Sequence, residues 1–378
     1  MMKLQEFIRD NEDWEHVLSH KPYSLKIKRD NGYILFAYNQ VESSFSRDIV
    51  QESRGVILRE SDMEVVCRPF DKFFNIQEGH ADTINWDTAR VQEKLDGSIM
   101  KLWFNDGLWR ISTNGMIDAA KATVGYGDRT FADLFWKALY STLRPGVYST
   151  TIPDRAIDDL LFILNINFTY IFELCTPYNR VVTRFTEYKL FHIGTRQNAT
   201  GKEMIHNIGI PKPKEFTFNG LDEIMNTVET LPFDEEGYVV VDANWNRVKI
   251  KSPAYVAVHY LKSNWSVRRM LELIIVNETS EFLSYFPEYK IDVDNVTTAL
   301  NNYIKKVQVQ IDYIRRHSLL DLKRKDFAFW ATQDSIIEQG IMFRFYQNQD
   351  FDWERAIKTI PIKRLINKIG LKDDGEED

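Results

Sequence analysis

The residues of this chain that could do chemistry gather first around Lys94, in the sequence Lys94-Leu95-Asp96-Gly97-Ser98. A lysine two residues before Asp-Gly, at the end of a strand-like run, is the arrangement that covalent transfer of a nucleotidyl group needs. The amine must face a phosphate from a tight turn, glycine gives that turn its backbone freedom, and the aspartate can lie near the amine and a metal ion. The alternative is an exposed Asp-Gly hairpin turn that carries a solvated lysine. The motif alone does not decide between the two.

Charged residues in strand-like segments further along the chain favour the chemical interpretation. Lys249 and Lys251 share one face of a predicted strand, where two cations repel each other unless an anion such as a polyphosphate lies near them. Glu173 lies in an apolar strand, where a carboxylate is costly to bury unless a partner such as a ribose hydroxyl or a metal ion is present. Each residue alone also fits a structural explanation, a solvated strand face for the lysines and a structural ion pair for Glu173. The other segments of this set are Glu52-Ser53-Arg54-Gly55, Arg68-Pro69-Phe70-Asp71-Lys72-Phe73-Phe74-Asn75 and Asp234-Glu235-Glu236-Gly237-Tyr238.

The elements that must position these residues are mainly strands up to about residue 251 and helices after it. Residues 1–20 have the pattern of a short amphipathic helix, and 118–145 and 155–163 are also predicted helices. The Asn105-Asp106-Gly107 turn predicts a hairpin directly after the Lys94 turn. The predicted strands are 33–38, 55–58, 63–67, 101–104, 108–111, 170–174, 188–193, 237–241 and 247–251.

A change of pattern after Ser252-Pro253 divides the chain, because apolar residues recur with helical period from Val256 to about Gly370. A length of 378 residues fits two or three domains. We therefore predict an α+β protein with a first domain at 1–253, whose residues 1 to about 80 form a β-rich subregion. An all-helical domain at 254–370 and a frayed acidic tail at 371–378 follow.

The composition excludes several classes of protein. A hydrophobic content of 44% and an aromatic content of 13% fit a packed core rather than a disordered chain. The net charge of −7 argues against a protein that coats nucleic acid everywhere, but it allows cations concentrated in a groove. Two cysteines, Cys67 and Cys175, without a C-x-x-C motif favour a reducing compartment and no zinc site. The charged start does not fit a signal peptide and no apolar run approaches ~18 residues, so we expect a cytoplasmic protein without a membrane span.

Taken together, these motifs resemble the T-even phage RNA ligase 1 family, within the superfamily of ATP-dependent ligases and mRNA capping enzymes. One departure is Asn114, which stands before Gly115 where the family has a basic residue; it can hydrogen-bond a nucleotide but carries no charge. The matching residues, in chain order, are Tyr38-Asn39, Ser53-Arg54-Gly55, Arg68-Pro69, Lys72-Phe73-Phe74-Asn75, Lys94 with Asp96-Gly97-Ser98, Phe172-Glu173, Pro177 with Asn179-Arg180-Val181-Val182, Glu236-Gly237-Tyr238-Val239, Lys249-Ile250-Lys251-Ser252, Tyr255-Val256 and His259.

The resemblance implies a nucleotidyltransferase fold of the ATP-grasp-like ligases, in which an antiparallel-sheet domain is followed here by helices rather than by an OB-fold barrel. It implies an ATP-dependent RNA ligase that uses Mg²⁺ or Mn²⁺. Lys94 would attack the α-phosphate of ATP to form lysyl–AMP, AMP would pass to a 5′-phosphate RNA end, and a 3′-hydroxyl would then seal the strand. The amine must be neutral to attack, and neighbouring cations would favour loss of its proton.

The resemblance also implies roles for individual residues. Glu281 is a further metal candidate, for which a solvated helix glutamate is the alternative. The implied catalytic residues are Lys94, Asp96, Glu236, Lys249, Lys251 and Tyr255; the implied ATP contacts are Tyr38, Arg54, Lys72, Glu93, Glu173, Lys249 and Lys251; and the implied metal ligands are Glu173, Glu236 and, through water, Asp96.

The expected partner is single-stranded or nicked RNA, with the tRNA anticodon loop as the family's example and a polynucleotide kinase–phosphatase as a functional partner. The resemblance also implies a phage-encoded protein. Two alternatives stay open: another covalent nucleotidyltransferase, namely a DNA ligase or a GTP-using capping enzyme, and a catalytically silent RNA-binding module. Basic residues of the helical region either track phosphates or form a solvated face. They are Lys305-Lys306, Arg315-Arg316 and Lys323-Arg324-Lys325.

Overall fold

The chain divides into two compact units, residues 1–257 and 258–378. Helix α7 (Pro253–Ser263) contains this division, which lies four residues after the boundary that the sequence pattern suggested. The computed structural model describes every residue except 1, 41, 125–127, 146–154, 264–265, 277–278, 280–281, 284–285, 334–336, 350 and 373–378.

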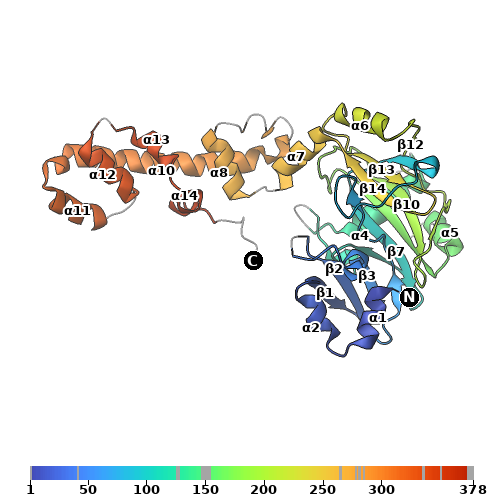
Figure 1. Ribbon diagram of the computed structural model, residues 1–378. Helices are drawn as coiled ribbons and strands as arrows, with labels where there is room; N and C mark the ends of the chain where they lie inside the picture. The colour runs from blue at the N-terminus through green and yellow to red at the C-terminus, as the bar shows by residue number, and fades with distance from the viewer. Residues whose placement is uncertain are drawn as a thin grey trace. The chain divides into compact units, whose positions relative to one another are not determined.

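A four-stranded antiparallel sheet forms the N-terminal part of the first unit (Figure 1). Its β-branched and aromatic residues, such as Ile34, Phe36 and Val56, pack against the two N-terminal helices. The prediction of one helix over residues 1–20 is wrong, because the chain becomes extended at Asn11, within a short run of poor helix formers. The elements in order are α1 (Lys3–Asp10), α2 (Trp14–Ser19), β1 (Leu25–Asp30), β2 (Tyr33–Tyr38), α3 (Asp48–Glu52), β3 (Arg54–Arg59) and β4 (Val65–Cys67).

Two five-stranded sheets make up the rest of the first unit. Their pairs are antiparallel except for a short parallel pairing of β14 with β5. The first has the order β11 (Glu203–Met204), β10 (Lys189–Gln197), β9 (Phe168–Cys175), β7 (Ser98–Asn105) and β8 (Leu108–Thr113). The second has the order β12 (Glu215–Phe216), β6 (Arg90–Glu93), β13 (Gly237–Val241), β14 (Arg247–Lys251) and β5 (Phe74–Asn75).

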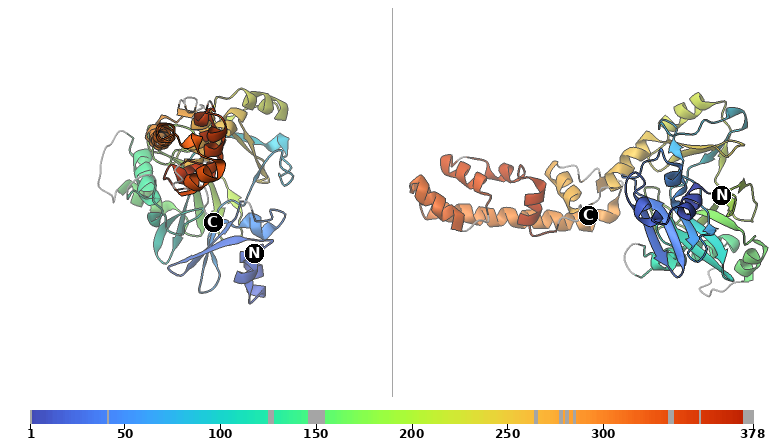
Figure 2. Two further views of the ribbon diagram at one scale, coloured as in Figure 1. Left: turned by 90° about the vertical axis from the view of Figure 1, so that its left-hand side faces the viewer. Right: turned by 60° about the horizontal axis from the view of Figure 1, so that its bottom comes forward.

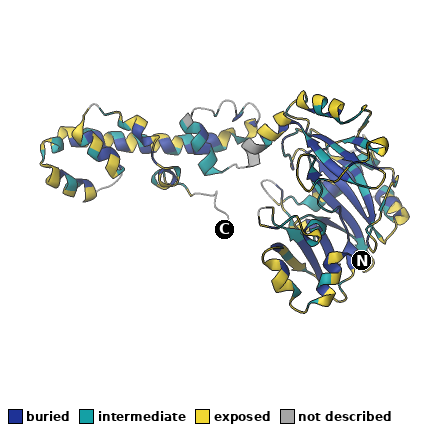
Figure 3. Ribbon diagram, in the orientation of Figure 1, coloured by how far each residue is buried: buried dark blue, intermediate teal, exposed yellow. Residues whose placement is uncertain are grey.

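A helix covers one face of each large sheet, and most strand residues are buried, as in β9, which is buried from Thr169 to Cys175. Met100 and Phe172 pack against Phe135 of α4 (Phe131–Leu143), and Val240 packs with Ile224 of α6 (Leu221–Glu229). Figure 3 shows the strands of both sheets as mainly buried. The predicted helix at 155–163 is α5 (Arg155–Ile163), whereas only 131–143 of the predicted helix at 118–145 is α-helical.

The second unit is helical throughout its described residues. The 27-residue helix α10 (Lys290–Arg316) runs along this unit, with shorter helices beside it (Figure 2). Its residues Leu300, Val307 and Ile311, at helical spacing, lie in one core with the other helices. The other α-helices are α8 (Val267–Val276), α11 (Arg324–Gln333), α12 (Gln339–Gln347), α13 (Trp353–Ile357) and α14 (Ile362–Lys368).

The predicted fold class is confirmed: antiparallel sheets are followed by helices, and the described residues after Lys251 contain no strand from which a barrel could form. The tail predicted at 371–378 lies outside the described residues from 373 onward. In the described part of the chain, no helix is both long enough and apolar enough to cross a membrane.

Candidate active site

Lys94 lies where the chain crosses from one large sheet to the other, because β6 ends at Glu93 and β7 begins at Ser98. Its backbone N–H donates to the carbonyl oxygen of Gly237 at 2.8 Å, which extends the β6–β13 pairing by one residue. Its amine lies 2.6 Å from Oε2 of Glu236, and Nζ of Lys251 lies 2.8 Å from Oε1 of the same carboxylate. The Lys94 side chain is 19% exposed. This ion-paired lysine does not fit the alternative of a solvated turn.

Gly97 is required in this turn because the neighbouring strand comes very close. A Cβ at position 97 would overlap the carbonyl oxygen of Leu174 on β9. The N–H of Gly97 donates to Oε1 of Glu173 at 3.1 Å, so the same close approach brings this buried carboxylate to the Lys94 turn. The glycine of the motif therefore sets the position of Glu173 relative to Lys94.

Glu173 is held in a crowded acidic environment. Burial raises the pKa of Glu173 to about 7; Lys94 and Arg54 oppose this rise, while the carboxylates of Glu236 and Asp96 add to it. Two acidic groups that repel each other in a buried place are stabilised by a cation between them. The carboxylates of Glu173 and Glu236 therefore form the part of the site that is suited to a positive charge.

Asp96 is the most firmly held carboxylate of the site. Its Oδ2 accepts hydrogen bonds from the backbone N–H groups of Val182 and Thr183 at 2.7 and 2.6 Å, and its Oδ1 accepts one from the hydroxyl of Tyr255 at 2.7 Å. Both oxygens are thus engaged by donors of the protein. Asp96 ties the Lys94 turn to the loop after β9 and to α7, and its proposed contact with a metal through water stays a prediction.

Replacing Tyr255 with phenylalanine is expected to lower the free energy of unfolding by about 1.5–3 kcal/mol, because a buried carboxylate loses a hydrogen bond. The loss should also slow lysyl–AMP formation, since Asp96 anchors the turn that carries Lys94. Thermal unfolding and a nucleotide-labelling assay measure the two effects. The matched control is Tyr33→Phe, which removes a 2.7 Å hydrogen bond to Asp106 elsewhere in the same unit and should reduce stability without slowing labelling. Equal labelling rates in the two variants would contradict the anchoring role.

Lys249 and Arg54 are two cations of the site that form no ion pair with a carboxylate of the described residues. Burial, together with the neighbouring cations Lys72, Lys94, Lys251 and Arg54, lowers the pKa of Lys249 to about 7. The pKa of Arg54 is also lowered, chiefly by burial. The ring centre of Phe73 lies 5.0 Å from the Arg54 guanidinium and 5.5 Å from the Lys249 amine. Such a group of partly desolvated cations is suited to bind a polyphosphate.

Lys72 and the aromatic rings around it, including that of Tyr38, form another side of the site. The Lys72 amine lies 4.8 to 5.6 Å from the ring centres of Tyr38, Phe45 and Phe74. Tyr38 in turn hydrogen-bonds to Arg54, which links this aromatic group to the cations. Flat rings beside a cation suit a nucleotide base and its phosphates.

Some predicted site residues do not join this cluster. The side chain of Glu93 is exposed, and only its backbone contributes, by pairing with Tyr238. Glu281 lies outside the described residues. Asn114 lies against Gly55, next to Arg54, and its Oδ1 is buried without a hydrogen-bond partner among the described residues. The roles proposed for Glu93, Glu281 and Asn114 therefore stay predictions.

The sequence reasoning missed Lys101, which is fully buried in the middle of β7. Its amine donates to the carbonyl oxygen of Gly55 at 2.7 Å, and burial lowers its pKa to about 8. A lysine between Met100 and Leu102 was a readable signal of the same kind as Glu173. The backbone donors to Asp96 left no such signal, because every residue type except proline carries a backbone N–H group.

The donor set fits a divalent metal ion with few protein ligands. Mg²⁺ and Mn²⁺ prefer oxygen ligands, and Mg²⁺ usually keeps several waters or substrate phosphates. Glu173 and Glu236 offer buried carboxylates, whereas among the described residues no group of three His, Cys, Asp or Glu side chains is arranged to hold a metal. A metal bound here would therefore complete its coordination with water and substrate oxygens.

Comparison with known proteins agrees with this geometry. A family model described as RNA ligase matches residues 52–255, which include Arg54, Lys94, Glu173, Glu236 and Lys249. The chain belongs to the RNA ligase family. The resemblance to the T-even phage RNA ligase 1 family is thereby confirmed.

Among relatives of this RNA ligase family member, a baculovirus protein of Autographa californica nuclear polyhedrosis virus is described as a candidate bifunctional polynucleotide kinase/RNA ligase. It is 30% identical over 76% of this chain and 43% of its own length. An RNA ligase of Rhodothermus phage RM378 is 27% identical over 61% of this chain and 65% of its own length. The chain thus spans less than two thirds of either relative. A solved archaeal ATP-dependent RNA ligase is similar at 13% identity and a TM-score of 0.43, covering 97% of this chain and 79% of the other.

Proposed function

We propose that this chain is an ATP-dependent RNA ligase that joins 5′-phosphate and 3′-hydroxyl RNA ends through lysyl–AMP and RNA–adenylate intermediates. The observation that carries the proposal is the Lys94 amine, held 2.6 Å from Glu236 on the turn between two sheets, with Lys251 on the same carboxylate. Membership of the RNA ligase family supports the same class of reaction.

In the first step, the neutral amine of Lys94 would attack the α-phosphorus of ATP. A bond from Nζ to phosphorus forms, the bond from phosphorus to the bridging oxygen of the β-phosphate breaks, and pyrophosphate leaves. Before it attacks, Lys94 must pass its proton to water and leave its ion pair with Glu236. The cations Lys249, Lys251 and Arg54 would then stabilise the negative charge on the transferring group.

Glu173 and Glu236 would hold Mg²⁺ or Mn²⁺ in this site. A metal bound there supplies positive charge that stabilises phosphate oxygens. The residues of the chain still do most of the positioning: Gly97 holds Glu173 at the turn, and Asp96 holds the turn to Tyr255. Holding the amine and the phosphate in fixed positions lowers the entropy cost of their reaction.

In the later steps, AMP would pass from Lys94 to a 5′-phosphate end, and a 3′-hydroxyl would attack that end and release AMP. The helical unit would contribute to RNA binding. Tyr313 is 47% exposed, its ring centre lies 4.0 Å from that of His317, and Arg315 and Arg316 stand between the two in the sequence. Exposed rings next to cations bind unstacked bases of RNA loops. We therefore propose a broken tRNA loop as one substrate, in RNA repair.

Two further proposals concern the partner enzyme and the cellular location of the reaction. The ends must carry a 5′-phosphate and a 3′-hydroxyl, so we propose that a polynucleotide kinase–phosphatase prepares them; the baculovirus relative is described with a kinase part. Because the reaction would consume ATP, we place it in the cytoplasm of a host cell in which a phage expresses the protein.

A labelling experiment tests the proposal against its alternatives. The protein is mixed with Mg²⁺ and either ATP or GTP labelled at the α-phosphate, and label that survives denaturation is measured. We expect label from ATP. Label from GTP alone would favour a capping enzyme, and no label from either would favour a silent RNA-binding module. Sealing of matched RNA and DNA strands then separates an RNA ligase from a DNA ligase.

A further inference from the structure

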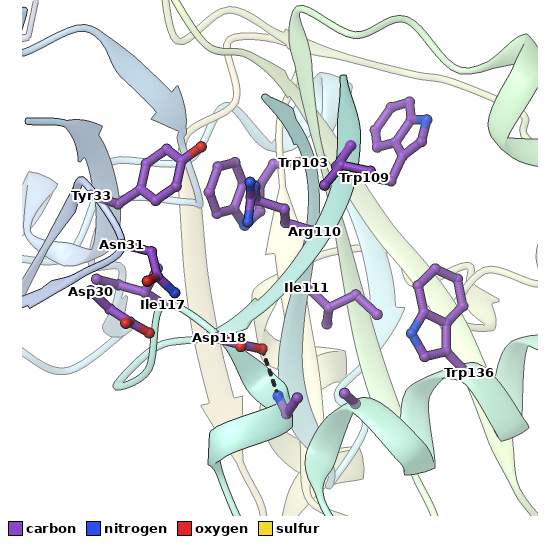
Figure 4. A pocket seen from close by; sticks show the side chains of 13 residues that line it. Asp30, Asn31, Tyr33, Trp103, Trp109, Arg110, Ile111, Ile117, Asp118 and Trp136 are labelled. Carbon is purple, nitrogen blue, oxygen red and sulfur yellow. Dashed lines mark hydrogen bonds between the residues drawn. The ribbon is translucent and has the colours of Figure 1, made fainter. Parts of the chain in front are cut away.

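One cavity of the first unit lies away from Lys94, along the edge strand β8 (Figure 4). Its volume is about 250 Å³. Four of its thirteen lining residues are aromatic and come from three places: Tyr33 from β2, Trp103 and Trp109 from the β7–β8 hairpin, and Trp136 from α4. Neither the sequence motifs nor the proposed reaction accounts for this concentration of rings.

Arg110 gives the cavity a positive, flat wall. Its guanidinium lies 5.1 Å from the ring centre of Tyr33 and 5.9 Å from that of Trp103. Nε of Arg110 and Nε1 of Trp103 are buried donors without an acceptor among the described residues. The lining also includes the carboxylates of Asp30, which is ion-paired with Lys121, and of Asp118, which accepts a hydrogen bond from the N–H of Ala120. A ligand that fits these walls is flat and has hydrogen-bond acceptors at its edge. It is also small, because the volume of the cavity is below the ~300 Å³ at which pockets for drug-sized ligands begin.

The cavity is connected to the candidate active site by a short piece of chain. Asn114 lies against Gly55, the neighbour of Arg54, and Ile117 lines the cavity only three residues later. Three residues span at most about 10 Å. Lys28 lies over this piece, where its amine donates to the carbonyl oxygen of Gly115 at 2.9 Å. Lys28 is exposed and has no carboxylate partner within the described chain, so its charge is available to a phosphate.

We propose that the cavity binds one unpaired base of the RNA strand whose end reacts at Lys94, with Lys28 contacting the phosphate backbone between the two places. This inference rests on the proposed function. Unstacked bases bind between aromatic rings and guanidinium planes, and the edge strand offers backbone groups that no second strand covers. A protein segment would fit this place less well, because it has no phosphate for Lys28 to contact.

The test fills the cavity without removing any of its walls. Ala120 is an exposed lining residue, so Ala120→Trp should block a base and leave the fold intact. The control is Ala243→Trp, at an exposed position in the β13–β14 turn outside the cavity. Labelling by ATP, which needs no RNA, should be unchanged in both variants. The KM for AMP transfer to a 5′-phosphorylated 12-mer RNA should rise about 10-fold in Ala120→Trp only, since one base stack is worth about that factor. The KM for a dinucleotide should not change, because it is too short to reach the cavity.

A second readout does not depend on activity. Single-stranded RNA with 4-thiouridine at successive positions is irradiated with the wild-type protein, and cross-linked peptides are identified. We expect cross-links to the peptides of Trp109 and Trp136 from one position of the RNA, and their loss in Ala120→Trp.

The outcomes separate the two proposals. If ATP labels the protein but Ala120→Trp has wild-type KM at every RNA length, the cavity inference is wrong and the ligase proposal stands. A changed oligomeric state in Ala120→Trp with an unchanged KM would likewise overturn it, in favour of a protein contact. If ATP does not label the protein, the ligase proposal fails, and the cross-links alone then support or overturn the cavity as a base-binding site.

Discussion

Replacing Lys94 with alanine is expected to abolish the retention of label from α-labelled ATP, to less than a thousandth of the wild-type amount. The reason is chemical: without the amine no bond to the α-phosphorus can form, and a missing nucleophile typically costs several orders of magnitude in rate. Gel electrophoresis after denaturation measures the label, and pyrophosphate release measures the same step independently.

The control for this variant is Lys189→Ala. Lys189 is also ion-paired, 3.5 Å from Glu187, but its side chain is 50% exposed, and it lies at the start of β10. Its removal should leave labelling unchanged. The Lys94 variant should also remain folded, because the amine is only partly buried and Lys251 stays paired with Glu236. Label that persists in Lys94→Ala would identify another nucleophile and end the proposed mechanism.

The second large effect is expected at Lys249. Its pKa of about 7 in the folded protein lies well below the ordinary value of 10.5, so the amine is mainly neutral at pH 8 and mainly charged at pH 6. A bound triphosphate favours the charged form. ATP binding at pH 8 should therefore take up close to one proton at Lys249, and at pH 6 almost none. Titration calorimetry at each pH, in buffers with different enthalpies of ionisation, measures this uptake.

Two variants of Lys249 sharpen the test. Lys249→Met should remove the proton uptake at pH 8 and slow lysyl–AMP formation about 100-fold or more, the cost of losing one group that stabilises charge in the transition state. Lys249→Arg should also remove the uptake, because arginine stays charged at both pH values, but it should keep part of the activity. Unchanged proton uptake in Lys249→Met would mean that another group titrates when ATP binds.

The structure also shows that the two lysines of β14, which share one face of the strand, have different surroundings. Lys249 and Lys251 are two residues apart on one face of β14. Only Lys251 reaches Glu236, at 2.8 Å, whereas Lys249 lies over Phe73 among other cations. Strand periodicity predicts that they share a face, but it says nothing about which residues from other strands lie opposite each one.

Several features could be read from the sequence because their causes are local. The β7–β8 hairpin follows from Asp106 and Gly107, both of which adopt positive φ, at 52° and 77°. Strands β2 and β13 follow from short continuous apolar runs, and β14 follows from its apolar alternation. The helical second unit follows from its 3.6-residue period. The break at Asn11 and the short extent of α4 were not predicted, because helix ends depend on a few residues and on packing.

The sequence by itself determined the chemistry that is available: the Lys94 turn, the carboxylates Glu173 and Glu236 and the cations Arg54, Lys249 and Lys251, in the order of an RNA ligase family member. Only the tertiary structure decided which of these groups touch. It paired Lys94 with Glu236, engaged both oxygens of Asp96, left Glu93 exposed and buried Lys101 beside Gly55. The physical reason is that ion pairs and pKa shifts depend on distance and on burial. Both are set here by residues 46 to 159 positions apart that only the packing of the sheets brings together.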